Sequence, residues 1–238
     1  MQTTVQLSVI RTTIIGLAAM AFVGCTASTP TLDTSPEAEM TFDGLYPVKG
    51  GRMDEAWARA DFDIESYSKV LMQDVGIEYR PGGESRRRSA LSTRSSHYEV
   101  TTAQKERFES LLREVFLDEL AKGDHFELVA EPGPDVLLIR AGLLDVVSFV
   151  PPDPLGNADV YLSRVGEATL VLEMRDSVSD AILVRAVDRR AAEDIGGSFT
   201  VSNRVTNSAE VRRLARHWAT GLRQGLDRFM APDDEAGE

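Results

Sequence analysis

The sequence predicts an α+β fold, a two-layer sandwich with two helices packed on one face of a mixed or antiparallel sheet of about 4–5 strands. Three observations support this class. Residues 166–190 alternate apolar and polar side chains on either side of a short polar turn, and residues 135–150 are apolar in both phases. Two segments, 101–122 and 207–230, carry apolar stripes at helical spacing. Adjacent strands placed between two helices are typical of an α+β domain.

The segment 166–190 predicts a β-hairpin. Ala168, Leu170 and Leu172 share one phase of the first strand, and polar residues occupy most of the other phase. Residues 176–180 are rich in turn formers, and the chain then runs extended to Asp188. An isolated hairpin is marginal in water, so further strands or helices must cover its apolar face.

The folded domain is predicted to span residues 42–230 and to begin near Phe42. Between Leu45 and residue 63 there is no clean period, so we expect an irregular or briefly helical segment whose large apolar residues pack on the core. Residues 67–79 read as the first strand, and Gly76 marks a bulge within it. Residues 80–97 are rich in Gly and Ser, and they predict an exposed loop that contains Arg86-Arg87-Arg88.

Residues 101–122 predict the first long helix, with Thr101 and Gln104 at the spacing of a capping box. Residues 126–130 begin a short strand. The apolar run 135–150 predicts a strand that is buried on both faces and lies centrally in its sheet. Because this strand is too long to stay straight, we expect a bend at Gly142.

The last helix is predicted to begin at Asn207, which caps it, with Glu210 at the capping-box position. Its apolar stripe includes Trp218, which we expect to be the main anchor on the sheet. Residues 231–238 predict an acidic disordered tail.

The first residues predict a lipoprotein signal peptide over 1–24. An apolar run as long as a signal-peptide core ends in Phe22-Val23-Gly24-Cys25, which resembles the lipobox of bacterial lipoproteins, with Phe22 where the usual residue is Leu. Cys25 is the single cysteine of the chain, and we expect it to carry diacylglycerol and an N-acyl chain such as palmitate. The alternatives are an ordinary cleaved signal with an incidental cysteine, or a buried thiol.

The residues after Cys25 predict both a flexible tether and the membrane to which the protein is sorted. Residues 25–41 contain few large apolar residues, and this composition is typical of a flexible tether with a reach of roughly 20–25 Å. Thr26 follows the cysteine, with no Asp there or at the next position. By resemblance to lipoprotein sorting in bacteria with two membranes, this implies an outer-membrane anchor and a periplasmic domain.

Composition and spacing argue against several activities. Acidic residues outnumber basic ones 38 to 26, giving a net charge of −12, so nucleic acid is not expected as a partner. No histidine lies at metal-ligand spacing from another ligand, so we predict no metal, no cofactor and no catalytic residue. Ser66 and Lys69 have a Ser-x-x-Lys spacing, but the partner motifs of penicillin-interacting enzymes are absent.

Two polar clusters remain as candidates. Asp188, Arg189 and Arg190 close the hairpin, and Asp188 continues its apolar phase, so it is expected at the sheet edge as a structural ion pair or as a binding contact. The arginines at 86–88 are expected to be solvated, with anionic lipid or glycan phosphate as the alternative.

Short segments across residues 42–230 resemble a family of bacterial lipoproteins carrying the domain of unknown function DUF3313. These segments are Phe42-Asp43-Gly44-Leu45, Ser66-Tyr67-Ser68-Lys69-Val70, Gly166-Glu167-Ala168, Val187-Asp188-Arg189-Arg190 and Trp218-Ala219. The hairpin turn, Val178-Ser179-Asp180, departs from the Thr-Gly-Glu-like sequence of the family. The resemblance implies an envelope lipoprotein and no known reaction.

From these features we expect a non-enzymatic accessory or binding domain that contacts another envelope protein. The alternative is a domain that binds a small ligand or glycan between sheet and helices. A hydrolase would require titratable side chains that converge in a cleft.

Overall fold

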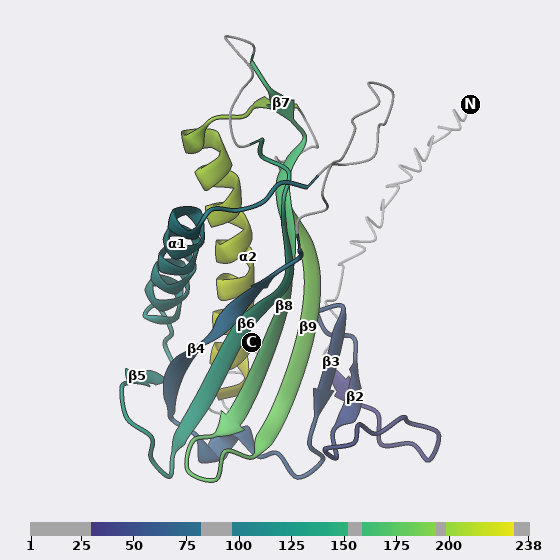
Figure 1. Ribbon diagram of the computed structural model, residues 1–238. Helices are drawn as coiled ribbons and strands as arrows, with labels where there is room; N and C mark the ends of the chain where they lie inside the picture. Colours follow the sequence, from purple (N-terminus) through teal and green to yellow (C-terminus); the bar gives the residue numbers. More distant parts are fainter. Residues whose placement is uncertain (1–29, 82–96, 152–158, 194–198, 231–238) are drawn as a thin grey trace, which may run out of the picture.

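The computed structural model describes residues 30–81, 97–151, 159–193 and 199–230 (Figure 1). The predicted signal peptide, Cys25, the Arg86–Arg88 run and the acidic tail lie outside these residues. No helix of the described part is long and apolar enough to cross a membrane.

An eight-stranded sheet forms one layer of the domain, with the strand order β1-β2-β3-β9-β8-β6-β4-β5. The strands span Thr31–Leu32 (β1), Tyr46–Lys49 (β2), Glu55–Ala58 (β3), Lys69–Tyr79 (β4), Glu127–Val129 (β5), Val136–Ser148 (β6), Arg164–Asp176 (β8) and Ile182–Glu193 (β9). A separate two-stranded ribbon joins β7 (Tyr161–Leu162) to β10 (Thr200–Val201). The sheet is mixed, because β4 runs parallel to β5 and β6 whereas the other pairs are antiparallel.

The second layer consists of two helices that cover one face of the sheet, α1 (Thr102–Leu120) and α2 (Arg204–Met230) (Figure 1). The predicted α+β class with two helices and a mixed sheet is therefore confirmed. The predicted number of about 4–5 strands is wrong, because the segment 45–63 contributes β2 and β3 and only a single 3₁₀ turn, Ile64–Ser66, follows them. Strands of two to four residues offer too few positions for an alternating pattern to emerge.

Part of the segment that the sequence marks as a tether joins the sheet. Thr31 pairs with Lys49, and Leu32 pairs with Val48, in an antiparallel ladder. Leu45, in the segment before β2, is fully buried. The chain therefore has sheet contacts before residue 42, where the domain was expected to begin.

The central hairpin of β8 and β9 is confirmed. Its strands pair from Arg164 with Glu193 to Arg175 with Ile182. Asp180 closes the turn with a φ of 59°, a left-handed conformation that Asp tolerates better than most residues. The Asp176 carboxylate fixes the turn by accepting hydrogen bonds from the backbone N–H and the hydroxyl of Ser179.

β6 lies between β8 and β4 and is largely buried on both faces, as its sequence predicts. At Gly142, where a bend was expected, β6 pairs regularly with Val171 of β8, while the register of β4 on its other side shifts between Asp74 and Ile77. Between β6 and β8 the irregularity lies three residues later, where the register shifts between Leu144 and Val147 and Asp145 has a φ of 55°. Arg80 holds this bulge through hydrogen bonds to the Asp145 carboxylate.

The two helix starts differ in how well the sequence predicts them. Thr101 caps α1, and the capping box with Gln104 is present. α2 begins earlier than expected, and its cap is Asn203, whose side-chain oxygen accepts the backbone N–H groups of Val205 and Thr206. Asn207 instead lies inside the helix and its side chain bonds Ser202. The predicted start was wrong because Asn207, four positions after Asn203, is also of the preferred capping type.

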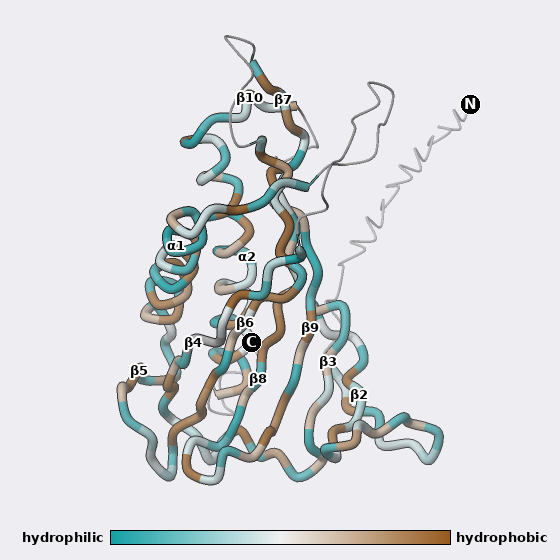
Figure 2. The backbone as a smooth tube through the Cα atoms, in the orientation of Figure 1, coloured by the Kyte–Doolittle hydropathy of each residue, from teal (hydrophilic) through white to brown (hydrophobic). Residues whose placement is uncertain are grey.

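The hydrophobic core fills the space between the helices and the sheet. Figure 2 shows hydrophobic residues running along the central strands, which present Leu137 and Ile139 of β6 and Leu170 and Leu172 of β8. The helices contribute Phe116, Leu120, Trp218, Leu222 and Leu226. The opposite face of the sheet is here called the helix-free face. It carries Arg140, Glu173 and Arg185, which occupy the alternate positions of β6, β8 and β9.

Candidate functional site

A cleft lies between α1 and the strands beneath it, and we call it the α1–β4 cleft. Its volume is about 250 Å³. Eleven residues line it: Met72, Gly76 and Ile77 of β4, Glu109, Leu112, Arg113 and Phe116 of α1, Ala141, Gly142 and Leu143 of β6, and Leu170 of β8. Gly76, Glu109 and Arg113 are exposed, whereas Phe116, Leu143 and Leu170 are buried. The mouth is therefore between α1 and β4, and the floor is the apolar core.

The outer edge of β4 adjoins this mouth. Of the 11 residues of β4, only Lys69–Leu71 pair with β5. Beyond them, Met72–Tyr79 has no strand on that side within the described residues, and Figure 1 shows β5 beside the lower part of β4 only. At about 3.3 Å per residue this free edge is roughly 25 Å long. Unpaired strand edges are templates for pairing with another chain.

Tyr79 lies at the far end of the same edge and has an unusual environment. Its hydroxyl is buried and has no hydrogen-bond partner among the described residues. Burial, and to a smaller extent the charge of Glu109, raises the pKa of Tyr79. The ring packs edge-on against Phe108, and the Lys105 ammonium lies 4.6 Å from its centroid. The phenol is therefore held protonated.

The polar cluster predicted at the end of the hairpin is divided between the two faces of the sheet. Asp188 lies on the helix side and is 1% exposed. Its Oδ2 accepts hydrogen bonds from Trp218 Nε1 at 2.7 Å and from Arg190 Nε at 2.6 Å. Val187 is the last residue of β9 that pairs with β3, so at Asp188 β9 has no strand on that side within the described residues. A buried carboxylate is costly unless it is paired, and these two donors satisfy that need.

Arg189 points to the helix-free face and does not join Asp188. Its guanidinium pairs with Glu167 at 2.7 Å, and its backbone N–H donates to Asp54 Oδ2. This arrangement follows from the alternation of side chains along a strand. The three consecutive polar residues thus form two separate contacts, and the one with Asp188 joins β9 to α2.

A second charged network crosses the helix-free face. Glu173 accepts hydrogen bonds from Arg175 and Arg185, and Arg185 also pairs with Asp43 at 2.7 Å. Burial favours the protonated form of Glu173, but the bonds from the two arginines outweigh it and lower the pKa of its carboxyl. Asp43 belongs to the segment before β2, so this network fastens the start of the domain to the central strands.

The remaining sequence candidates do not converge. The Ser66 hydroxyl donates to Asp63, and the Lys69 ammonium pairs with Asp135 at 2.8 Å, so each contacts a carboxylate of its own. His97 Nε2 lies 3.1 Å from the carbonyl oxygen of Pro81. Within the described ranges, no three His, Cys, Asp or Glu side chains are grouped as a metal site would require.

Comparison with protein families decides the affiliation. A family model described as a protein of unknown function, DUF3313, matches residues 37–222, which is most of the chain. The chain belongs to the DUF3313 family. This supports the family resemblance in the sequence, and the match brings no known reaction. The search among curated proteins found no match for this DUF3313 protein.

Several solved structures are distantly similar to this DUF3313 protein. Protein XCC0632 from Xanthomonas campestris, of family DUF330, is 10% identical with a TM-score of 0.43, covering 70% of this chain and 86% of that one. A PelC dodecamer from Paraburkholderia phytofirmans is 10% identical, covers 66% and 89%, and has a TM-score of 0.31. A putative neuraminyllactose-binding hemagglutinin homolog from Helicobacter pylori is 10% identical, covers 71% and 87%, and has a TM-score of 0.33. All three are distant likenesses.

The sequence did not reveal the α1–β4 cleft or the free edge of β4. One signal was present, because the predicted strand at 126–130 is much shorter than the one at 67–79. This difference in length leaves a free edge only if the two strands are neighbours, and the sequence does not predict that they pair.

Proposed function

We propose that this DUF3313 protein is a lipoprotein of the bacterial outer membrane whose domain lies in the periplasm and binds another envelope protein without catalysing a reaction. The anchor is proposed from Phe22-Val23-Gly24-Cys25, with diacylglycerol and an N-acyl chain on Cys25. Two or more acyl chains give stable attachment, because each buried methylene contributes about 0.8 kcal/mol.

One observation carries the binding role, namely the free edge of β4 from Met72 to Tyr79. Strand edges in monomeric proteins are commonly short, bulged or covered. β4 is one of the longer strands of this sheet, and β5 covers only its first residues. A long uncovered edge supports recognition of a second polypeptide.

The test is crosslinking in the producing cells followed by pull-down of the tagged, lipidated protein. The expected result is one envelope protein in stoichiometric amount that remains after washing at raised salt, which removes weak charge-driven contacts. Recovery of no specific protein would overturn the binding role.

The anchor is tested with a Cys25→Ser variant, which we expect to leave the membrane fraction and to lose labelling by radioactive palmitate. Membrane attachment that is unchanged in this variant would refute the lipid anchor. The loss of partner recovery in the soluble variant would show that the two must meet at the membrane.

The second candidate is binding of a small ligand, and the α1–β4 cleft favours it. Its walls are mainly aliphatic, with Glu109 and Arg113 as the charged residues, so an apolar ligand fits better than a glycan, which needs many hydrogen-bonding groups. Native mass spectrometry of the protein purified from its own envelope would reveal a bound small molecule. An Ala141→Met variant, which fills the cleft, should lose that molecule, and retention would place the ligand elsewhere.

A further inference from the structure

β5 shows how a strand pairs with the outer edge of β4, and the strand position that it occupies is here called the row beside β4. It pairs in parallel with Lys69–Leu71, and its middle residue, Leu128, packs against the hydrophobic core. Glu127, one position earlier, is exposed. A strand in this row therefore directs alternate side chains toward the helix side of the sheet. The row continues beyond β5 for eight residues of β4 that lack a strand on this side in the described chain.

The α1–β4 cleft lies where the next inward-facing side chains of that row would fall. Met72, Gly76 and Ile77 belong both to the free edge and to the cleft lining. The volume of about 250 Å³ is roughly eight times the ~30 Å³ that one water molecule occupies in the liquid. It therefore accommodates one large apolar side chain or two smaller ones.

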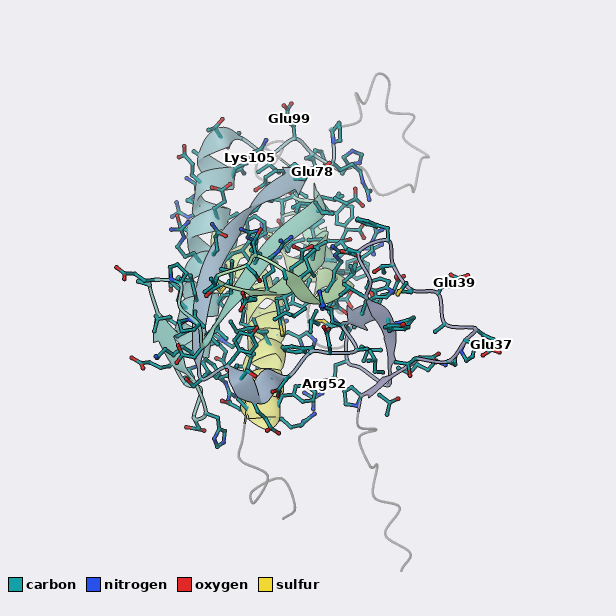
Figure 3. All side chains as sticks on the ribbon, turned by 90° about the horizontal axis from the view of Figure 1, so that it is seen from below. Glu37, Glu39, Arg52, Glu78, Glu99 and Lys105 are labelled. Carbon is teal, nitrogen blue, oxygen red and sulfur yellow. The ribbon has the colours of Figure 1, made fainter. Side chains whose placement is uncertain are left out.

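Two features limit indiscriminate pairing at this edge. The register of β4 against β6 shifts between Asp74 and Ile77, which marks a bulge. Figure 3 shows the charged side chains of Glu78, Glu99 and Lys105 gathered at the far end of β4, near the start of α1. Bulges and charges of this kind protect edges against unselective association, so the edge suits a partner of matching shape.

We infer that the free edge of β4 accepts an extended segment of another envelope protein as an added strand, and that an apolar side chain of this segment enters the α1–β4 cleft. The backbone groups of the edge supply affinity, and the cleft selects for an apolar residue at one position, as in other cases of strand addition. The inference rests on the proposed function, because it names the surface and the chemistry of the partner.

Gly76 offers a substitution at the cleft mouth where a new Cβ has open space. It is exposed, and a Cβ added to it would meet no atom within 4 Å. The matched control is Gly51, between β2 and β3, which is also exposed and for which an added Cβ meets nothing within 4 Å. Gly76→Trp should therefore place an indole at the mouth, while Gly51→Trp places the same group on a distant loop.

The experiment begins with a photoreactive amino acid at Glu78, incorporated into the full lipidated protein in the producing cells. Glu55, exposed on β3, serves as the control position. The linked peptide is then identified, synthesised and used as the probe in binding measurements with the purified mature protein in detergent. A second version of the peptide carries proline at its centre, where the missing N–H prevents strand pairing.

The expected result is a Glu78-specific adduct with a different envelope protein. Its peptide should bind the unchanged protein and Gly51→Trp equally, and should bind Gly76→Trp at least ten-fold more weakly, with a similar loss for the proline peptide. Equal binding to both tryptophan variants, or full binding of the proline peptide, would overturn the inference. So would adducts formed only with lipid or with a second copy of this chain.

Failure of this inference is distinguishable from failure of the proposed function. If Glu78 yields no protein adduct while the pull-down still recovers a stoichiometric partner, the partner binds another surface and only the inference falls. If neither experiment finds a partner, both the inference and the proposed binding role are refuted.

Discussion

Replacing Trp218 with Phe tests the buried contact that joins α2 to the sheet. Trp218 is 2% exposed, and its Nε1–H donates to Asp188 at 2.7 Å. The substitution keeps an aromatic ring but removes the donor. A hydrogen bond to a charged group contributes about 1.5–3 kcal/mol. The lost ring atoms leave a small cavity that adds about 1 kcal/mol.

We therefore expect Trp218→Phe to lower the free energy of unfolding by about 2.5–4 kcal/mol. For a domain of this size that corresponds to a Tm lower by roughly 5–15 °C. The measurement is urea and thermal unfolding of the soluble Cys25→Ser protein, followed by circular dichroism. Asp188 keeps its contact with Arg190 in this variant, so the domain should still fold.

The matched control is Trp57→Phe, since Trp57 is the other tryptophan of the chain and is only half-buried, on β3. We expect Trp57→Phe to lower the free energy of unfolding by about 1 kcal/mol or less, because it removes less buried surface. The reasoning is refuted if the two variants are equally stable. A double-mutant cycle with Asp188→Ala, which removes the acceptor, isolates the pair, and additive effects would show that Trp218 and Asp188 do not interact.

Three further predictions concern stability. Glu173 has a pKa below its ordinary value of 4.5, so its contribution is present above about pH 4.5 and is lost as the pH falls through the lower folded-state pKa. Glu173→Gln should thus flatten the acid side of the curve of unfolding free energy against pH, and an unchanged slope would contradict this. Gly166→Ala should destabilise the protein by about 1–3 kcal/mol, because the new Cβ would lie 2.5 Å from a carbonyl oxygen of β6. Gly225→Ala, inside α2 with open space, should instead raise stability by about 0.5–1 kcal/mol in the same urea titration. Asn203→Ala should lower the free energy of unfolding by about 1 kcal/mol, because it removes the cap of α2, and Asn207→Ala should lower it by less. A larger loss for Asn207→Ala would show that α2 is capped at the later residue.

Patterns confined to one segment were predicted well. The β8–β9 hairpin, the capping box of α1 and the doubly buried strand β6 each follow from side chains near one another in the sequence. Periodicity measures which faces of an element are buried, and a strand of 12 or 13 residues contains enough positions for it to be clear. β1 to β3 were missed because they are too short to show any period.

The cap of α2 and the irregularity of β6 were misplaced, because more than one nearby residue suits each role. Asn203 and Asn207 are both good caps, and the chain uses the first. Gly142 is a plausible bend, but the β6–β8 bulge forms at Asp145, where Arg80, the residue after β4, binds the carboxylate. At the bulge, the contact with Arg80 comes from outside β6, so the sequence of β6 alone does not show it.

The sequence by itself determined the α+β class, the two helices, the central hairpin and the apolar phase to which Asp188 belongs. Only the tertiary structure decided the strand order, and with it the position of β9 inside the sheet and of β4 beside a strand too short to cover it. The physical reason is that hydrophobic alternation specifies which face of a strand is buried, whereas the neighbour on each edge is selected by backbone hydrogen bonds that every sequence offers alike.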